Sequence, residues 1–265
     1  MDFKREWKRV LEKAHMYGLL AEYYKYRDPD LFMHYYRKHY KYTKKVAGMT
    51  RQMRGRGTVA REGFHNPQRQ DEEQRGTIRV IHASPDAPAV DVVANGQTIG
   101  QNLAFGQVSE TLSLPAGSYQ IGVYPRGQRG QPLYSEEVTL QPGRKYTIAA
   151  INRLDDLNLQ VIEDEPRVRE GMSKIRLVHL SVDAPPLDLA TDGGDVLLFN
   201  LTYPNVSEYY VSPPAIQDLE LRAAGSERVL LEIPNVSLRP DSAYSIYVLG
   251  LSEGEPPLQA VVLQD

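Results

Sequence analysis

The chain has 265 residues, of which 41% are hydrophobic and 25% charged, close to the average for a globular protein, and it contains no cysteine. Disulfides, thiolate metal sites and cysteine nucleophiles are therefore excluded. No stretch approaches the ~18–20 apolar residues that span a membrane. Charged residues interrupt the first 25 positions, so we expect neither a membrane span nor a signal peptide.

The net charge of −3 conceals two oppositely charged parts. Residues 1–57 carry 15 Lys and Arg against 6 Asp and Glu, or +9, and 8 of the 17 tyrosines. Residues 76–265 carry 13 against 24, or −11. A basic, tyrosine-rich head is thus joined to an acidic body.

The head has the pattern of two helices. Residues 3–26 form an amphipathic stripe, and Asp28-Pro29 is a capping residue followed by a favoured first helical residue. A second helix is predicted over roughly 29–46, ending at Gly48. The first stripe contains Phe3, Trp7, Val10, Leu11, Ala14, Tyr17, Ala21 and Tyr24, and the second contains Phe32, Tyr35, Tyr36, His39, Tyr42 and Val46. We predict a basic helical-hairpin arm over 1–48 and a flexible linker over 49–76.

The body has the pattern of short strands. From Thr77 onward, runs of β-branched and aromatic residues alternate with Pro, Gly and Asp turns every ~8–12 residues, which is typical of an antiparallel sandwich. Asn95-Gly96 predicts a tight hairpin. The strands expected in the first domain are 77–83, 89–94, 108–114, 117–124, 134–140, 145–152 and one near 157–163.

The body is also duplicated. Residues 78–92 (IRVIHASPDAPAVDV) match residues 175–189 (IRLVHLSVDAPPLDL), with 8 of 15 positions identical. The offset is 97 residues here and becomes 98 farther along, as Val108-Ser109-Glu110 against Val206-Ser207-Glu208 shows. A single loop insertion explains the change. Two homologous domains are predicted, over 77–165 and 173–265, and the charged, Pro-ending stretch 163–166 lies between them.

The opening motif of each copy, His82-x-Ser84-Pro85-Asp86-Ala87-Pro88-x-Val90-Asp91 in the first, resembles a widespread bacterial family of Ig-like β-sandwich modules, domain of unknown function number 4397. The resemblance covers about 190 residues and leaves out the helical arm. It implies tandem Ig-like sandwiches and life at a cell surface, but no established activity. Members of the family typically carry a secretion signal, and this sequence departs from that pattern. The expected fold is mainly β: two tandem Ig-like antiparallel β-sandwich domains after an N-terminal α-helical hairpin.

The motif residues have two interpretations. Imidazole and carboxylate groups are suitable ligands for a divalent ion, which would make a metal-dependent hydrolase a third, weaker hypothesis. A structural role is favoured, because an element that determines the fold must recur in both copies, whereas a catalytic one need not. The motif residues are His82, Ser84, Asp86, Pro88 and Asp91 in the first copy, and His179, Ser181, Asp183, Pro185 and Asp188 in the second.

No familiar catalytic pattern is present elsewhere: the sequence lacks a G-x-S-x-G elbow, an H-E-x-x-H pair, a phosphate loop and a dinucleotide-binding fingerprint. We therefore predict no catalytic residue, no cofactor and no metal site, and expect the protein not to be an enzyme.

The arm is the candidate interaction element, because Tyr and Arg are enriched at interfaces. The candidate interface residues are Trp7, Tyr23, Tyr26, Tyr36, Arg37, Tyr40 and Lys41. The leading hypothesis is a structural protein that self-associates, with the arm of one copy binding the body of another. It would be a spore-coat, spore-surface or filament component at a cell or spore surface. The alternative is a binding module whose arm attaches to an anionic polymer (nucleic acid, wall polymer or lipid headgroups), with other surface proteins as further partners.

Overall fold

The computed structural model describes residues 3–24, 29–55 and 74–265. The chain divides into two compact units, Met1–His65 and Asn66–Asp265. Among the described residues, the first unit holds the two α-helices and the second holds all the strands.

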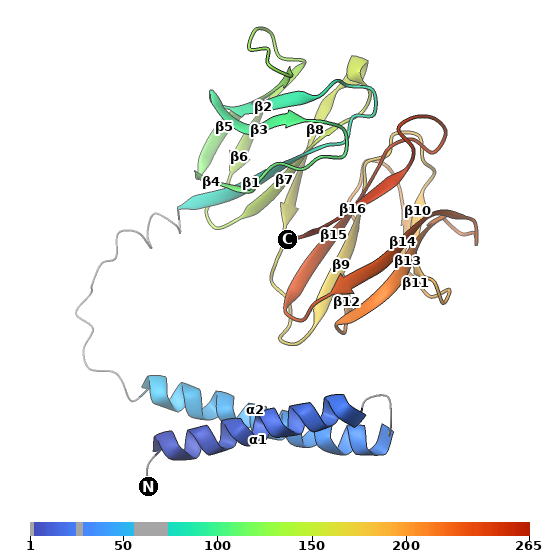
Figure 1. Cartoon of the computed structure of the whole chain (residues 1–265). Helices are drawn as coiled ribbons and strands as arrows, with labels where there is room; N and C mark the ends of the chain where they lie inside the picture. The colour runs from blue at the N-terminus through green and yellow to red at the C-terminus, as the bar shows by residue number, and fades with distance from the viewer. Residues whose placement is uncertain (1–2, 25–28, 56–73) are drawn as a thin grey trace, which may run out of the picture. The chain divides into compact units, whose positions relative to one another are not determined.

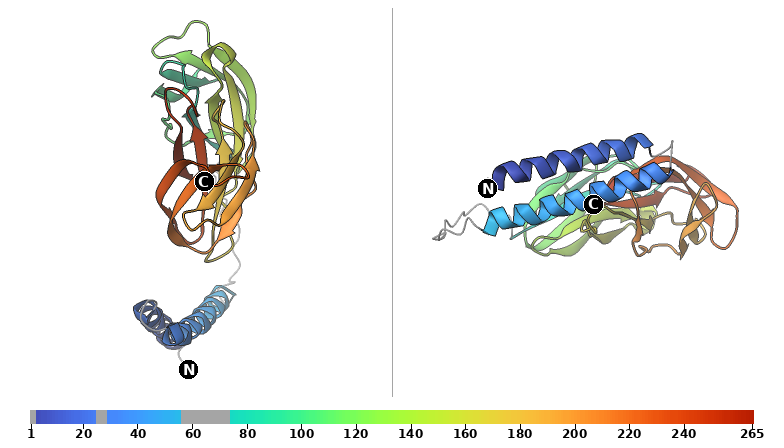
Figure 2. Two further views of the ribbon diagram at one scale, coloured as in Figure 1. Left: turned by 90° about the vertical axis from the view of Figure 1, so that its right-hand side faces the viewer. Right: turned by 90° about the horizontal axis from the view of Figure 1, so that it is seen from below.

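Two antiparallel helices, α1 (Phe3–Tyr24) and α2 (Pro29–Gly55), form the first unit (Figure 2). Lys45 of α2 forms an ion pair with Glu6 near the start of α1, and His39 contacts the carbonyl of Ala14 farther along. The prediction that the second helix ends at Gly48 was wrong. A single glycine costs a helix only about 1 kcal/mol relative to alanine, which is too little to end it. Neither helix, over the residues described, is long and apolar enough to cross a membrane.

Small and aromatic side chains line the contact between the helices. Val10, Ala14 and Ala21 are buried, and the Tyr17 ring stacks on those of Tyr35 and Tyr42, with ring centroids 6.4 and 5.4 Å apart. The predicted stripes are correct for these positions but wrong for two others, Leu11 and Tyr36, which are 40% and 48% exposed. The predicted linker 49–76 overlaps the end of α2, and its residues 56–73 lie outside the described residues.

The first repeat is a sandwich of two four-stranded sheets with the orders β4-β1-β7-β8 and β3-β2-β5-β6 (Figure 1). A 3₁₀ turn at Leu154–Asp156 precedes its last strand. The strands are β1 (Arg75–His82), β2 (Val90–Ala94), β3 (Gln97–Leu103), β4 (Leu112–Pro115), β5 (Gly117–Pro125), β6 (Tyr134–Leu140), β7 (Lys145–Ile151) and β8 (Asn158–Asp164).

The second repeat has the same topology, with the orders β12-β9-β15-β16 and β11-β10-β13-β14. Its strands are β9 (Ser173–His179), β10 (Leu187–Thr191), β11 (Val196–Leu201), β12 (Tyr210–Ser212), β13 (Ala215–Ala223), β14 (Val229–Leu238), β15 (Ser242–Leu249) and β16 (Gln259–Gln264). The mainly β fold with two tandem sandwiches is confirmed. The sheets are antiparallel except for one parallel pair in each repeat, β1 with β7 and β9 with β15.

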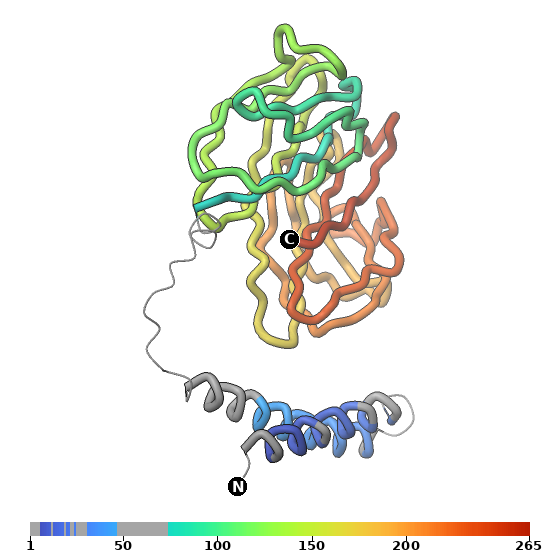
Figure 3. Tube along the Cα trace, turned by 60° about the vertical axis from the view of Figure 1, so that its left-hand side comes forward, coloured from blue at the N-terminus to red at the C-terminus, as the bar shows by residue number. Residues whose placement is uncertain are grey.

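Each sandwich has its own core, and a third apolar cluster joins the two. The third cluster comes from the outward faces of the sheets that contain β1 and β9, so the repeats pack together within one compact unit (Figure 3). Equivalent positions contribute from both sides: Ile81 and Val178, Ala83 and Leu180, Ala149 and Tyr247, Ile151 and Leu249.

Candidate functional site

The motif histidine is buried in both repeats. The Nε2–H of His82 donates to the carbonyl of Pro88 at 3.1 Å, and His179 donates to Pro185 at 3.2 Å. Desolvation lowers the pKa of both imidazoles, opposed in part by these carbonyl contacts. Each Nδ1 is buried without a hydrogen-bond partner within the described part of the chain. The histidines hold the loop that links the first two strands of each repeat.

The last motif carboxylate fastens two loops by accepting backbone hydrogen bonds. Asp91 accepts from the backbone N–H groups of Asn102 (2.7 Å) and Gly127 (3.0 Å). These hydrogen bonds lower the pKa of Asp91, the Asn102 contact most strongly. Asp188 makes the same contacts in the second repeat, with Asn200 (2.6 Å) and Gly225 (2.9 Å).

The first motif carboxylate reaches a distant loop. Asp86 accepts from the backbone N–H of Leu154 at 2.8 Å, and Asp183 accepts from that of Ser252 at 2.7 Å. Both contacts join the motif loop to a loop that is 68 or 69 residues away in the sequence.

The motif serine differs between the copies. Ser181 donates to the carbonyl of Gly250 at 2.7 Å, whereas the buried Ser84 hydroxyl has no partner within the described part of the chain. Among the described residues, no three His, Asp or Glu side chains are grouped so that they could hold a metal ion.

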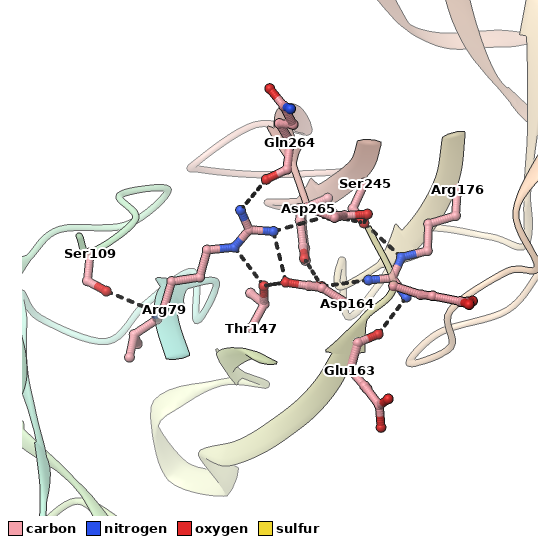
Figure 4. Close-up of polar contacts among 12 residues, drawn as sticks. Arg79, Ser109, Thr147, Glu163, Asp164, Arg176, Ser245, Gln264 and Asp265 are labelled. Carbon is pink, nitrogen blue, oxygen red and sulfur yellow. Dashed lines mark hydrogen bonds and ion pairs between the residues drawn. The ribbon is translucent and has the colours of Figure 1, made fainter. Parts of the chain in front are cut away.

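The structure adds a polar site between the repeats that the sequence analysis did not identify (Figure 4). Arg79 and Arg176, equivalent residues of β1 and β9, both bind the carboxylate of Asp164, at 3.1 and 2.6 Å. Arg79 also pairs with Asp265 at 3.2 Å. Because Asp164 belongs to the first repeat and Asp265 to the second, each arginine reaches across the interface.

The site is reciprocal. Lys145 lies opposite Asp164 in the first repeat, and its equivalent, Ala243, accepts the backbone N–H of Asp265 in the second. Asp164 and Asp265 are therefore equivalent positions. Each carboxylate accepts a hydrogen bond from a hydroxyl of its own repeat, Thr147 for Asp164 (2.8 Å) and Ser245 for Asp265 (2.8 Å).

Burial raises the pKa of two acidic groups of this network, Asp164 and Tyr209. The side chains of Asp164, Arg79 and Arg176 are only 3%, 11% and 6% exposed. Desolvation raises the pKa of Asp164, and the Arg79 guanidinium opposes the shift. Desolvation also raises the pKa of Tyr209, whose hydroxyl donates to Asp265 at 2.7 Å and whose ring lies 4.7 Å from the Arg176 guanidinium.

A network of buried, mutually neutralising charges fixes the relative orientation of two surfaces, because a slip of either surface would leave a charge buried without a partner. The Arg–Asp network therefore joins the two sandwiches across their interface. A signal for it was present in the sequence: Arg79 and Arg176 are among the positions identical in both copies.

The candidate arm residues fall into three groups. Trp7 is half-buried on α1, and Tyr36, Arg37, Tyr40 and Lys41 are exposed on α2. The side chains of the last two, Tyr23 and Tyr26, lie outside the described residues. Spacings of three and four residues place the exposed group on one side of α2.

Solved structures with some likeness to the chain are remote. The Bacillus anthracis TIE protein is 10% identical, with a TM-score of 0.23, over 67% of this chain and 34% of that one, so the match spans about a third of its length. A candidate cell adhesion protein from Bacteroides fragilis is 9% identical (TM-score 0.20; 71% of this chain, 96% of that one). A fimbrial assembly protein from Parabacteroides distasonis is also 9% identical (TM-score 0.21; 71% and 98%).

No curated protein gives a significant sequence match. The model of one family, described as a domain of unknown function (DUF4397), matches residues 76–190 and 173–265. The two matches together span both sandwiches and their buried interface, which is well over half of the chain, and they leave out the helices. The chain is therefore a member of the DUF4397 family and carries the domain in tandem.

Proposed function

We propose that this protein is a non-enzymatic structural component of a cell or spore surface that self-associates, the arm of one copy binding the body of another. The observation that carries the proposal is the opposite charge of the two units: +9 over residues 1–57 and −11 over residues 76–265. Oppositely charged surfaces steer association and select its partners.

The arm has the chemistry of an interface. Tyr36 and Tyr40 are 48% and 53% exposed on α2, beside Arg37 and Lys41, and the Lys44 ammonium lies 4.8 Å from the centre of the Tyr40 ring. Such side chains bury a large area while keeping a polar tip. A head-to-tail contact that does not close on itself produces a filament or a lattice. The protein would therefore be a component of a filament or of a spore coat.

Negative-stain microscopy with light scattering tests the proposal, on the full chain and on a variant that begins at Gln74. This start keeps all of β1, which begins at Arg75, and the carbonyl of Gln74 that accepts the N–H of Ala116. We expect particles or filaments from the full chain and monomers from the shortened one. Monomers from both would contradict self-association.

One observation favours a second candidate function, attachment to an anionic polymer. Met33, His34, Arg37, Lys38 and Lys41 line a groove on α2, and cations with interleaved aromatic rings suit phosphate contact with base stacking. Binding to a polyphosphate or a single-stranded nucleic acid should then weaken steeply as salt rises. Binding that does not change with salt would contradict this alternative.

A further inference from the structure

The two repeats allow a comparison of their outer faces position by position. In the first repeat Ser118 of β5 lies opposite Thr139 of β6, and in the second Ile216 of β13 lies opposite Ser237 of β14. Both residues of the second pair follow those of the first by 98 positions, so the pairs are equivalent. Differences between them belong to the second repeat and not to the fold.

The first difference is an apolar residue. Ser118 and Thr139 share a hydroxyl–hydroxyl hydrogen bond of 3.1 Å on the outer face of the first repeat. Ile216 replaces Ser118 in the second repeat and is 73% exposed. Single exposed apolar residues are common on protein surfaces. Ile216 alone therefore does not indicate a binding surface, and its neighbours must be considered with it.

The second difference is charge. Asp218 and Glu220 follow Ile216 on the outward side of β13, and Glu232 lies directly opposite Glu220 on β14. Like charges in directly opposite positions destabilise a sheet. The equivalents of these three residues in the first repeat are neutral: Gln120, Gly122, and Ser135, which lies opposite Gly122 as Glu232 lies opposite Glu220. The first repeat carries one acidic residue at this part of its outer face, Glu137, opposite Gln120.

The charges on this face are only partly neutralised within the repeat. Arg222 pairs with Glu220 at 2.6 Å, and Asp218 accepts the backbone N–H of Asn235 at 2.6 Å. Within the described residues, neither Asp218 nor Glu232 forms an ion pair with a cation. Among the described residues, the second repeat thus keeps two carboxylates without an ion pair, Asp218 and Glu232, on a face that also exposes Ile216. A cationic, aromatic partner would neutralise the carboxylates and cover the isoleucine.

The exposed side of α2 has the complementary chemistry. Its exposed residues at spacings of three and four are Met33, Tyr36, Arg37, Tyr40, Lys41 and Lys44. This side is about 16 Å long at 1.5 Å per residue. The stretch of β13 from Ile216 to Glu220 is about 13 Å long at 3.3 Å per residue, so the two are similar in length.

We propose that the β13–β14 face, defined by Ile216, Asp218, Glu220 and Glu232, is the surface of the body that binds the exposed side of α2 from a second copy of this chain. In this contact the tyrosines cover the isoleucine, and the cations neutralise Asp218 and Glu232. The inference rests on the proposed self-association and assigns its site.

Sedimentation velocity of the full-length chain tests the assignment, at about 0.1 M and about 1 M salt, where the screening length falls from about 10 to about 3 Å. Three single variants address the contact: Glu232→Lys and Ile216→Ser on the body, and Lys41→Glu on α2. We expect each to raise the dissociation constant for self-association about tenfold. Combining Lys41→Glu with Glu232→Lys should restore most of the association, because the two charges exchange signs.

The matched control is Glu137→Lys, which makes the same charge change on the outer face of the first repeat, where Glu137 is exposed. It should leave association unchanged. An equal loss in this control would overturn the assignment, because net charge alone would then explain the effect. So would a charge-exchanged double variant that associates no better than the single ones.

Two outcomes separate this inference from the proposed function. If the unaltered chain stays monomeric at every concentration, self-association itself fails and the assignment fails with it. If the chain associates and Lys41→Glu weakens the association while Glu232→Lys and Ile216→Ser do not, self-association through the arm stands and the β13–β14 face is the wrong surface.

Discussion

Arg79 and Arg176 occupy the same position in the two repeats, and their guanidinium groups bind opposite oxygens of one carboxylate, that of Asp164. The Nε–H of each also donates to a hydroxyl of its own repeat, Thr147 for Arg79 and Ser245 for Arg176. Duplication has thus produced two arginines that meet at a shared anion in the interface.

We predict that Asp164→Asn destabilises the body strongly. The change leaves two buried guanidinium groups with too little negative charge, and removing one partner of a buried ion pair costs about 3–5 kcal/mol. Urea unfolding measures the effect. Glu163→Gln is the control, because Glu163 pairs with Arg144 at an exposed position, where an ion pair contributes about 1 kcal/mol or less. Similar losses in both variants would contradict a dominant role for Asp164.

The stability of the body should fall as the pH is lowered through about 6.5, the ordinary histidine pKa. Burial lowers the pKa of His82 and His179 in the folded state. Below about pH 6.5 the unfolded chain therefore binds protons that the folded chain does not, which favours unfolding. The loss continues down to the folded pKa values and then levels off.

Urea midpoints at about pH 7.5 and about pH 5 measure this dependence. Each histidine contributes at most about 1.4 kcal/mol per pH unit. His82→Gln and His179→Gln should each reduce the slope between the two pH values, whatever they do to stability at the higher pH. A slope unchanged in both variants would assign the pH dependence to other groups.

Asp91→Ala and Asp188→Ala should destabilise the body by similar amounts, about 1–3 kcal/mol each. Each removes the acceptor of two backbone N–H groups in a buried position. Asp86→Ala should cost less, because that side chain is 43% exposed and water can replace it. Chemical unfolding of the three variants tests the order, and an equal loss at Asp86 would contradict it.

Gly18 should tolerate no large side chain. A β-carbon there would lie 3.0 Å from Nδ1 of His39, the ring that also contacts the carbonyl of Ala14 at 2.8 Å. We expect Gly18→Leu to separate the helices and lower the melting temperature of the helical signal in far-ultraviolet circular dichroism. Adding His39→Ala should recover part of the loss. A Gly18→Leu variant that melts like the unaltered chain would contradict this contact.

Much of the body could be predicted from the sequence because the two repeats are different sequences that encode the same fold, so their patterns can be compared. The hairpin at Asn95-Gly96 was predicted from residue type alone, and both residues have positive φ angles, 45° and 85°. The strand at 134–140 has the predicted bounds. Local turn chemistry and period-two alternation were sufficient here, since both act within a few residues.

The polar network between the repeats could not be predicted in the same way. Arg79 and Arg176 follow the offset of 97, but Asp164 and Asp265 are 101 residues apart because the preceding loops differ in length. The acidic stretch around Asp164 had the composition of a solvated boundary, and only the packing of the sandwiches buries it. Charge composition does not reveal burial. The sequence therefore contained the four residues but did not indicate that they lie together in a buried interface.

The reciprocal packing of the repeats also limits what the body can assemble. Each sandwich uses the same face, the outer side of the sheet that contains β1 or β9, to bind its neighbour. A contact between like faces has a valence of one and is satisfied by a single partner. A third sandwich could not join the pair through it, so growth beyond one chain must begin from surfaces that the duplication left unused.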